Sequence, residues 1–413
     1  MRQLHKRFST DQVKMILNLY IHGSMELKEV LNQLEVKERR FYKILAQYKK
    51  DKLNFSIEYS RDSPNRKIDP NIEEVIRSEF EKEKSIIENR AIPVNDYNYS
   101  VVRDEVENLT GKRLALQTII NRSKSWGYFI PDKPKKKVHD RVVITDAIGM
   151  LMQHDASCHQ WSPFAKEKWS LITTLDDHSR KMLFGDFFLN ETAWAHIKSV
   201  ESTTLKYGAG LSYYADNHSI FRFVVARDSM WRNTYKHTND VLTQWRQVIE
   251  ACGMNVIYAL SPQAKGKIER PYQWLQDRIV RRCAKGGVKH IDDAREILAD
   301  EISQYNDKRV HSTTKEIPSI RFQRAIDEGR NMFKPLILPD HIESTKDIFC
   351  FREKRRVNGY REISWQGKVL KVNKDIPVGA MVDLHSIPEE PTPELRLLHN
   401  NKIKNIYRFI KQN

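Results

Sequence analysis

Between residues 150 and 285, the order of apolar and amphipathic segments restricts the folds open to this chain. Runs of apolar residues predict three strands, at 150–155, 169–175 and 182–189. The segments that follow alternate between helix and strand, with helices expected at 192–206, 240–252 and 267–285 and short strands at 211–215 and 255–259. Three strands followed by this alternation indicate a mixed α/β sheet.

Three carboxylates occupy defined places in this pattern. Asp155 is expected to end the first strand and Asp216 the fourth, whereas Glu269 lies where a loop passes into a helix. Hard divalent cations such as Mg²⁺ prefer oxygen ligands. Two such ions stabilise both the attacking and the leaving oxygen of an in-line phosphoryl displacement. The trio therefore indicates chemistry that cuts or joins strands of nucleic acid.

Other acidic residues in the same region compete for this role. The pair Asp176 and Asp177 is typical of a turn between the second and third strands. Asp146 precedes the buried strand, and Glu191 is expected to cap the helix that follows it, where a carboxylate interacts well with the helix dipole. Asp186 is a further rival. The pattern alone therefore leaves the choice among these acids open.

Charge narrows the class of partner. The 413 residues carry a formal net charge of +16, and a positive field of this size attracts polyanions, of which nucleic acid is the commonest in a cell. A basic protein without a special partner is the alternative. The sequence has no uninterrupted apolar run of about 18 residues and a charged beginning, so we expect no membrane association. Four scattered cysteines fit a reducing, cytoplasmic compartment.

Residues 9–50 predict three short helices, because apolar residues recur there at helical spacing. The third follows a tight turn and has a basic outer face, on which Arg39, Arg40 and Lys43 are candidate DNA contacts. A helix, a tight turn and a basic final helix are typical of a helix-turn-helix, whose last helix enters the major groove. A small helical bundle with a solvated basic face is the alternative.

Three more helices are expected at 70–84, 99–109 and 115–126. The last is basic, with Arg122 and Lys124 as candidate DNA contacts, and the group is predicted to be a second helix-turn-helix unit. A stretch rich in proline and lysine follows at 131–137. It is either a tether that contacts phosphates or an ordinary solvated linker.

The carboxyl-terminal region is rich in predicted strands, between 349 and 384. From 351 to 374 it has eight lysines and arginines against two glutamates. A small basic β-barrel that holds the DNA backbone is one interpretation, with Arg355 and Arg356 as contacts, and a solvated β surface is the other. The sequence thus predicts four domains: two DNA-binding helical domains at 1–55 and 56–140, a catalytic core at 141–332, and a small basic β-barrel at 333–413.

The three carboxylates stand within the motifs QHDAS (153–157), YADNHSIFR (214–222) and SPQAKGKIER (261–270). These motifs resemble those of DDE recombinases of the retroviral-integrase superfamily, and within it bacterial insertion-sequence transposases. The resemblance covers about residues 145–330. It implies an RNase H-like core with a mixed five-stranded sheet and two Mg²⁺ or Mn²⁺ ions per site. Asp155 would bridge both ions, and Asp216 and Glu269 would hold one each.

The same resemblance implies cleavage of DNA followed by strand transfer. The implied partners are double-stranded DNA, as element ends and as target, and further copies of the chain assembled on it; an accessory protein from the element is left open. Lys265, Lys267 and Arg270 flank Glu269 and are candidate phosphate contacts. A silent DNA-binding regulator and a nuclease that cuts without joining are the alternative functions.

The sequence departs from the pattern of the superfamily in the spacing of its last two carboxylates. Between Asp216 and Glu269 the separation is 53 positions, which is longer than in many members of the superfamily. The extra chain is expected at 223–238, as a DNA-contacting insertion or as a surface loop. Because the predicted order of strands and helices is intact on both sides, Glu269 keeps its assignment.

Overall fold

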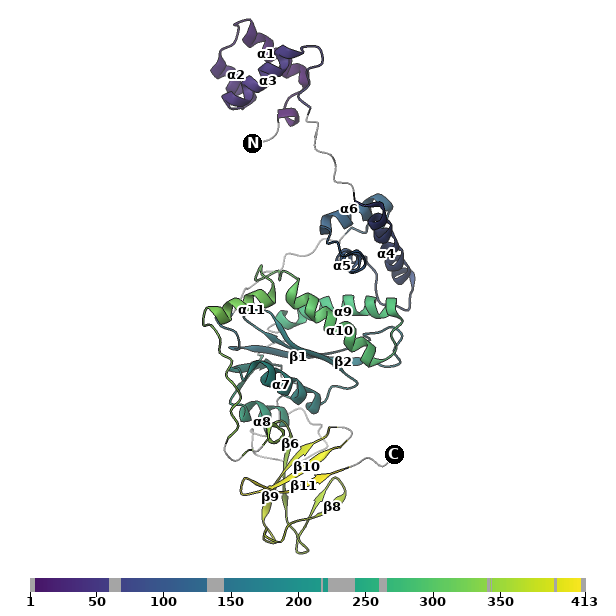
Figure 1. Cartoon of the computed structure of the whole chain (residues 1–413), viewed down its shortest axis with the longest axis vertical. Helices are drawn as coiled ribbons and strands as arrows, with labels where there is room; N and C mark the ends of the chain where they lie inside the picture. The colour runs from purple at the N-terminus through teal and green to yellow at the C-terminus, as the bar shows by residue number, and fades with distance from the viewer. Residues whose placement is uncertain are drawn as a thin grey trace, which may run out of the picture. The chain divides into compact units, whose positions relative to one another are not determined.

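The computed structural model describes residues 4–58, 68–131, 145–216, 218–221, 242–259, 266–339, 342, 344–389 and 392–409, with backbone alone at 266–269 (Figure 1). Two compact units divide the chain, Met1–Pro70 and Asn71–Asn413. Among the described helices, none is both long enough and apolar enough to cross a membrane.

The first unit consists of α1 (Thr10–Ile21), α2 (Leu27–Leu34) and α3 (Glu38–Lys50), preceded by a 3₁₀ turn at Leu4–Lys6. Ser9 caps α1, because its hydroxyl accepts a hydrogen bond from the Gln12 amide at 3.2 Å. The apolar faces of the three helices meet in one core: Val13, Leu17, Val30, Leu34, Phe41 and Leu45 are all buried there. The three predicted helices and their inward faces are confirmed.

The second unit begins with α4 (Pro70–Glu88), α5 (Tyr99–Thr110) and α6 (Leu116–Trp126). Phe80 of α4 stacks on Tyr128, with ring centroids 5.1 Å apart and planes 6° apart. Gly111 and Gly127 end α5 and α6 in the left-handed conformation, with φ of 67° and 82°, which glycine adopts without steric cost. The predicted helices are confirmed, and α4 extends four residues beyond its predicted end.

A five-stranded sheet with the order β3-β2-β1-β4-β5 forms the centre of the second unit. Its strands are β1 (Met152–His159), β2 (Trp169–Asp176), β3 (Met182–Phe188), β4 (Ser212–Ala215) and β5 (Asn255–Tyr258). Strands β1, β2 and β3 pair antiparallel, whereas β4 pairs parallel with both β1 and β5. This mixed sheet fits the predicted RNase H-like core.

The first strand is longer than predicted. The sequence indicates an end at Asp155, but β1 continues to His159, so Asp155 lies within the strand. The polar residues beyond Asp155 lack an apolar pattern, yet they pair in register with the buried strand β2 as far as His159 opposite Trp169. Hydrogen bonding to β2 therefore extends β1 past the point where its apolar residues end.

Helices cover both faces of this sheet (Figure 1). On one face, α7 (Ala193–Tyr207) and α8 (Gln244–Ala251) pack with Met152 and Tyr213 in one core cluster. On the other face, α9 (Gly266–Gly286) and α10 (Ile291–Asp307) pack with Leu171 and Leu175 in a second cluster. Helix α11 (Pro318–Asp327) adds Phe322 to the first cluster. Helix α8 begins four residues later than predicted, because Thr243 caps it.

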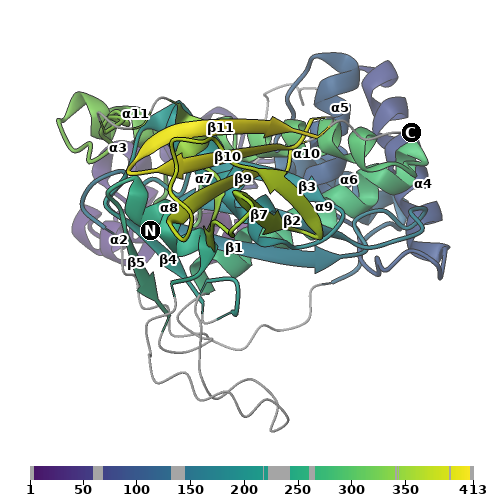
Figure 2. The same cartoon turned by 90° about the horizontal axis from the view of Figure 1, so that it is seen from below.

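The carboxyl-terminal strands form two hydrogen-bonded groups. Strands β6 (Phe351–Arg356), β9 (Met381–Ile387), β10 (Glu394–His399) and β11 (Lys402–Arg408) form an open sheet with the order β11-β10-β9-β6, part of which faces the viewer in Figure 2. Strands β7 (Glu362–Trp365) and β8 (Lys368–Lys371) form a separate hairpin that follows the 3₁₀ turn Thr345–Asp347 in the chain. A closed barrel, as predicted, is not confirmed by these pairings.

Strands β10 and β11 were not among the predicted strands. Asn400 and Asn401 join them, and both have left-handed φ, of 53° and 59°. A two-residue turn with two positive φ angles matches the twist of the strands that it connects, and asparagine tolerates that conformation. The pair Asn-Asn between apolar segments was therefore the sequence signal for this hairpin.

Candidate active site

Strands β1 and β4 bring two of the three predicted carboxylates together. Their parallel pairing places Gln153 level with Tyr214, and two residues further along each chain stand Asp155 and Asp216. Neighbouring strands lie about 4.8 Å apart, so the two acids occupy adjacent positions. Side chains alternate across a sheet, and His154 and Ala215 belong to the face of α7 and α8. Asp155 and Asp216 therefore belong to the opposite face, which α9 covers.

Helix α9 contacts β1 beside Asp155. The Tyr272 hydroxyl donates to the Asp155 carbonyl at 2.7 Å and accepts from the Thr173 hydroxyl at 2.8 Å. Burial, reinforced by the negative charge of Asp155, raises the pKa of Tyr272 well above its ordinary value, so this donor stays protonated. Gln276 donates to Ser157 at 3.2 Å one turn further along. Two adjacent turns of α9 thus hold the strand that carries Asp155.

The side chain of Glu269 lies outside the described residues, but its backbone belongs to α9. Its position is three residues before Tyr272, and positions with this spacing share one face of a helix. The same face contacts β1 through Tyr272. The fold therefore places the third predicted position on the helix that covers Asp155 and Asp216.

The described donors fit a hard cation. Two carboxylates at adjacent positions of one sheet supply the oxygen ligands that Mg²⁺ prefers. The His218 amide donates to Asp216 Oδ1 at 2.8 Å and so orients that carboxylate. Within the described part of the chain, no three His, Cys, Asp or Glu side chains are grouped closely enough to hold a metal ion. Glu269, the third predicted donor, has its side chain outside that set.

Two of the rival acids have structural roles. Asp176 is fully buried and accepts hydrogen bonds from the Ser179 amide at 2.7 Å, the Ser179 hydroxyl at 2.6 Å and the Gly149 amide at 2.9 Å. This confirms the predicted turn, and burial raises the pKa of the Asp176 carboxyl. Asp186 pairs with Arg295 at 3.0 Å.

The predicted capping role of Glu191 is wrong. Thr192 occupies the cap position of α7, and its hydroxyl accepts from the Ala195 amide at 3.1 Å. Glu191 instead pairs with Nε2 of the buried His196 at 3.2 Å. That hydrogen bond lowers the pKa of the Glu191 carboxyl against the opposing effects of burial and of the negative charge of Asp216. Sequence reasoning considered Glu191 but assigned it the wrong role. Thr192, a better capping residue directly after it, was the signal that Glu191 does not cap α7.

The predicted DNA contacts of the first unit are exposed. Arg39, Arg40 and Lys43 all lie on the outer face of α3. Arg122 of α6, by contrast, is bound within the protein, because its Nε lies 2.8 Å from both carboxylate oxygens of Glu73. Its neighbour Lys124 is exposed, with Nζ 4.6 Å from the centre of the Phe129 ring.

Near the candidate site, Arg270 is exposed on α9, whereas Lys265 and the side chain of Lys267 lie outside the described residues. The insertion predicted at 223–238 and residues 132–137 of the basic tether also lie outside them. Arg355 and Arg356 are on β6, where their Nε atoms donate to the carbonyls of Ser364 at 3.2 Å and Gly379 at 3.1 Å. Arg356 is exposed, whereas Arg355 is half-buried.

Buried ion pairs attach α4 and α5 to the outer face of α9. Glu83 of α4 pairs with Arg281 of α9, whose guanidinium also donates to the Asp96 carbonyl. Lys285 lies 3.0 Å from Glu83 and 3.3 Å from Glu79. Glu79, Glu83 and Arg281 are all buried. We refer to these residues, with Arg278, Asp104 and Glu301, as the α9 ion network.

The second half of the α9 ion network involves Arg278. Its guanidinium lies 2.7 Å from Asp104 of α5 and 2.5 Å from the buried Glu301 of α10. Ile86, Ile92 and Val94 pack with Val280 of α9 in an apolar cluster beside these ions. The helix that carries Glu269 is therefore held by β1 on one face and by the second helical group on another.

The lowered pKa of His311, in the loop after α10, leads us to expect that stability depends on pH. Burial lowers its pKa from 6.5 to about 4, and the charges of Arg180, Arg309 and Arg270 act in the same direction. Between these two values the unfolded chain binds the proton and the folded chain does not, so the free energy of unfolding should increase as pH rises from about 4 to 6.5. Chemical denaturation at several pH values measures this. His311→Asn should flatten the dependence, and an unchanged profile would contradict it.

The mixed sheet and the helices on both of its faces fit an RNase H-like core. Two curated proteins are similar to the chain. A putative transposase, y4bF of Sinorhizobium fredii, is 25% identical over 298 residues, and the transposase for insertion sequence IS1202 of Streptococcus pneumoniae is 24% identical over 319 residues. The chain is therefore similar to proteins named as transposases, as its motifs predict.

These matches cover 70% and 71% of the chain, and 60% and 67% of the two relatives. No family model matches the chain. Two solved structures are similar at low TM-scores: the simian T-cell lymphotropic virus intasome in complex with PP2A regulatory subunit B56 gamma and the HTLV-2 integrase catalytic core domain in complex with magnesium. Their TM-scores are 0.31 and 0.27, their identities 10% and 14%, and they cover 74% and 41% of this chain and 95% and 92% of their own.

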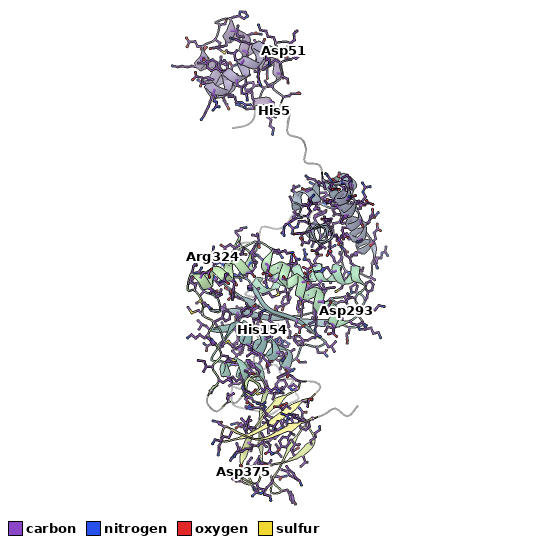
Figure 3. All side chains as sticks on the ribbon, in the orientation of Figure 1. His5, Asp51, His154, Asp293, Arg324 and Asp375 are labelled. Carbon is purple, nitrogen blue, oxygen red and sulfur yellow. The ribbon has the colours of Figure 1, made fainter. Side chains whose placement is uncertain are left out.

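The labelled side chains of Figure 3 include His154, the residue directly before Asp155, which lies at the level of the five-stranded sheet. It was not predicted to have a role. Its ring is fully buried and stacks on Trp245 of α8, with centroids 5.5 Å apart and planes 16° apart. The candidate site therefore has a buried polar residue immediately behind it.

Proposed function

We propose that the chain is a DNA transposase that binds the ends of a mobile element, cuts them and joins them to target DNA. The observation that carries this proposal is the parallel pairing of β1, which contains Asp155, with β4, which ends directly before Asp216, in a sheet covered by the helix of Glu269. The similarity to proteins named as transposases supports DNA as the substrate and transposition as the outcome.

In this proposal, Asp155, Asp216 and Glu269 would together hold two Mg²⁺ or Mn²⁺ ions. When bound, such ions lower the pKa of the attacking water or 3′-hydroxyl and neutralise charge on the phosphate. Tyr272 and Gln276 hold β1 so that Asp155 keeps its place. Lys265, Lys267 and Arg270 contact phosphates near the cut.

The remaining regions bind DNA. Helices α2 and α3 act as a helix-turn-helix with Arg39, Arg40 and Lys43 in the groove, since these cations lie on the exposed face of α3. The group α4–α6 contributes Lys124, and the basic carboxyl-terminal strands contribute Arg355 and Arg356. Arg122 is not part of this surface, because it pairs with Glu73. Two element ends have to be held together, so several copies of the chain assemble on DNA in the cytoplasm.

The test uses purified protein, labelled DNA from the flanks of its gene, a target plasmid and Mg²⁺. We expect joined products that disappear when the metal is chelated. Cleaved ends without joining would instead support a nuclease, and binding without cleavage would support a silent regulator. Binding should weaken steeply as salt rises, because each phosphate contact releases counterions.

A further inference from the structure

A line of hydrogen bonds runs through the core behind the candidate site. His154 Nδ1 lies 3.0 Å from the Thr174 hydroxyl, and His154 Nε2 lies 2.8 Å from Nδ1 of His196. His196 Nε2 lies 3.2 Å from Glu191 Oε1, and the Thr174 hydroxyl lies 3.0 Å from that of Ser199. Both imidazoles and both hydroxyl residues are buried, whereas Glu191 is 28% exposed.

Chemistry gives this line one direction. An ionised carboxylate only accepts hydrogen bonds, so His196 donates to Glu191 from Nε2. Neutral imidazole then accepts at Nδ1, which makes Nε2 of His154 the donor between the two rings. His154 accepts at Nδ1 from Thr174, and Thr174 accepts from Ser199. With these donor and acceptor roles, each neutral ring is held in one tautomer, protonated at Nε2.

The same rings contact the elements that carry both carboxylates. Phe221, which follows Asp216, lies 5.6 Å from the His154 ring and 4.8 Å from the His196 ring, centroid to centroid. Tyr213 of β4 packs edge-on against His154 at 5.7 Å. Asp155 follows His154 directly, and Asp216 lies between Tyr213 and Phe221. The two imidazoles therefore form a buried contact between the segments that carry the two acids.

We propose that Glu191 is a positioning residue that acts through His196 and His154. By accepting from His196 it fixes the orientation of both rings, and the rings fix the spacing between Asp155 on β1 and Asp216 after β4. This inference rests on the proposed function, since it assigns the two acids to metal binding. It predicts that the hydrogen-bond acceptor at position 191 matters, and that its charge does not.

The first test compares Glu191→Ala with Glu191→Gln. The glutamine retains a carbonyl acceptor for His196, whereas alanine removes it. Loss of residues that orient metal ligands typically reduces metal affinity or activity about 10- to 100-fold, and we expect this for alanine in Mn²⁺ binding and in DNA cleavage. Glutamine should stay within about threefold of the wild type. Equal loss in both variants, or no loss in either, would overturn the inference.

Glu201→Ala is the matched control, because Glu201 also lies at α7 but pairs with Lys198 at 2.6 Å, and it should leave both measurements unchanged. Thermal unfolding of each variant checks that it is folded. Glu191→Ser, whose side chain is too short to reach His196, breaks the same hydrogen bond if the alanine variant does not fold.

The second test reads the tautomers directly, by ¹⁵N NMR of histidine-labelled protein. In the wild type, His154 and His196 should each show protonation at Nε2 alone, and Glu191→Ala should give mixed tautomers in both rings. Unchanged tautomers would overturn the inference that Glu191 orients both rings. This measurement needs neither DNA nor metal, so it is independent of the proposed function. If the wild-type protein is inactive but Glu191→Ala changes the tautomers as expected, the result counts against the proposed function and not against the orienting role of Glu191.

Discussion

Replacing Asp155 with asparagine is expected to abolish DNA cleavage and joining while DNA binding remains. The amide removes the negative charge proposed to hold the cations and keeps nearly the same shape. Metal ions contribute several kcal/mol to charge stabilisation in the transition state, and each 1.36 kcal/mol changes a rate tenfold. The loss should therefore be about 10³-fold or more. Gel assays of labelled end DNA measure cleavage, joining and binding on one preparation.

The matched control is Asp186→Asn, the same chemical change in the same sheet. The Asp186 carboxylate pairs with Arg295 at 3.0 Å, and both side chains are more than a third exposed. A pair of this kind contributes little to stability, so the control should cleave normally. Asp216→Asn and Glu269→Gln should behave like Asp155→Asn. Normal cleavage by any of these three variants would contradict the site assignment.

Replacing Arg281 with methionine is expected to lower the free energy of unfolding of the second unit by about 3 kcal/mol or more, because it leaves the buried Glu83 without its α9 partner. Lys285, 3.0 Å from Glu83, offsets part of the loss. Methionine keeps most of the volume, so the change reports mainly on charge. Denaturant unfolding followed by tryptophan fluorescence measures it.

Lys84→Met is the control for that prediction. Lys84 lies 4.0 Å from Glu88 on the exposed side of α4, and exposed pairs contribute about 0–1 kcal/mol. The double variant Glu83→Leu, Arg281→Met should regain stability relative to Arg281→Met, since it leaves no unpaired charge in the core. An Arg281→Met protein as stable as the control would show that the α9 ion network does not hold these helices together.

Local signals predicted most of the elements. Helical spacing located α1 to α3, and the apolar runs located the strands near Asp155 and Asp216, whereas the pairing of β1 with β4 is known only from the structure. Prediction failed where distant residues decide. Strand β2 extends β1 beyond its apolar part, and Arg122 is bound to Glu73, 49 positions away. The residues around Arg122 and those around Glu73 contain no signal that predicts this pair.

Glu191 shows the same limit within the site. Its carboxylate was interpreted by its neighbours in sequence, as a cap, whereas its partner His196 faces it only once α7 has formed. The hydrogen-bond line to His154 then depends on the packing of α7 against the sheet. Spacing alone cannot report such a contact, because it joins residues 42 positions apart.

The α9 ion network has a consequence for where this chain can be divided. Buried charges pair across α4, α5, α9 and α10. Separating these helices would leave charges buried without a partner, so the four helices form one structural unit. The position best suited to exchange of the first helical unit is therefore the boundary near Pro70, where that compact unit ends, and not the lysine-rich stretch after Pro131. A graft made at the later position would separate α9 from the helices whose charged residues pair with it.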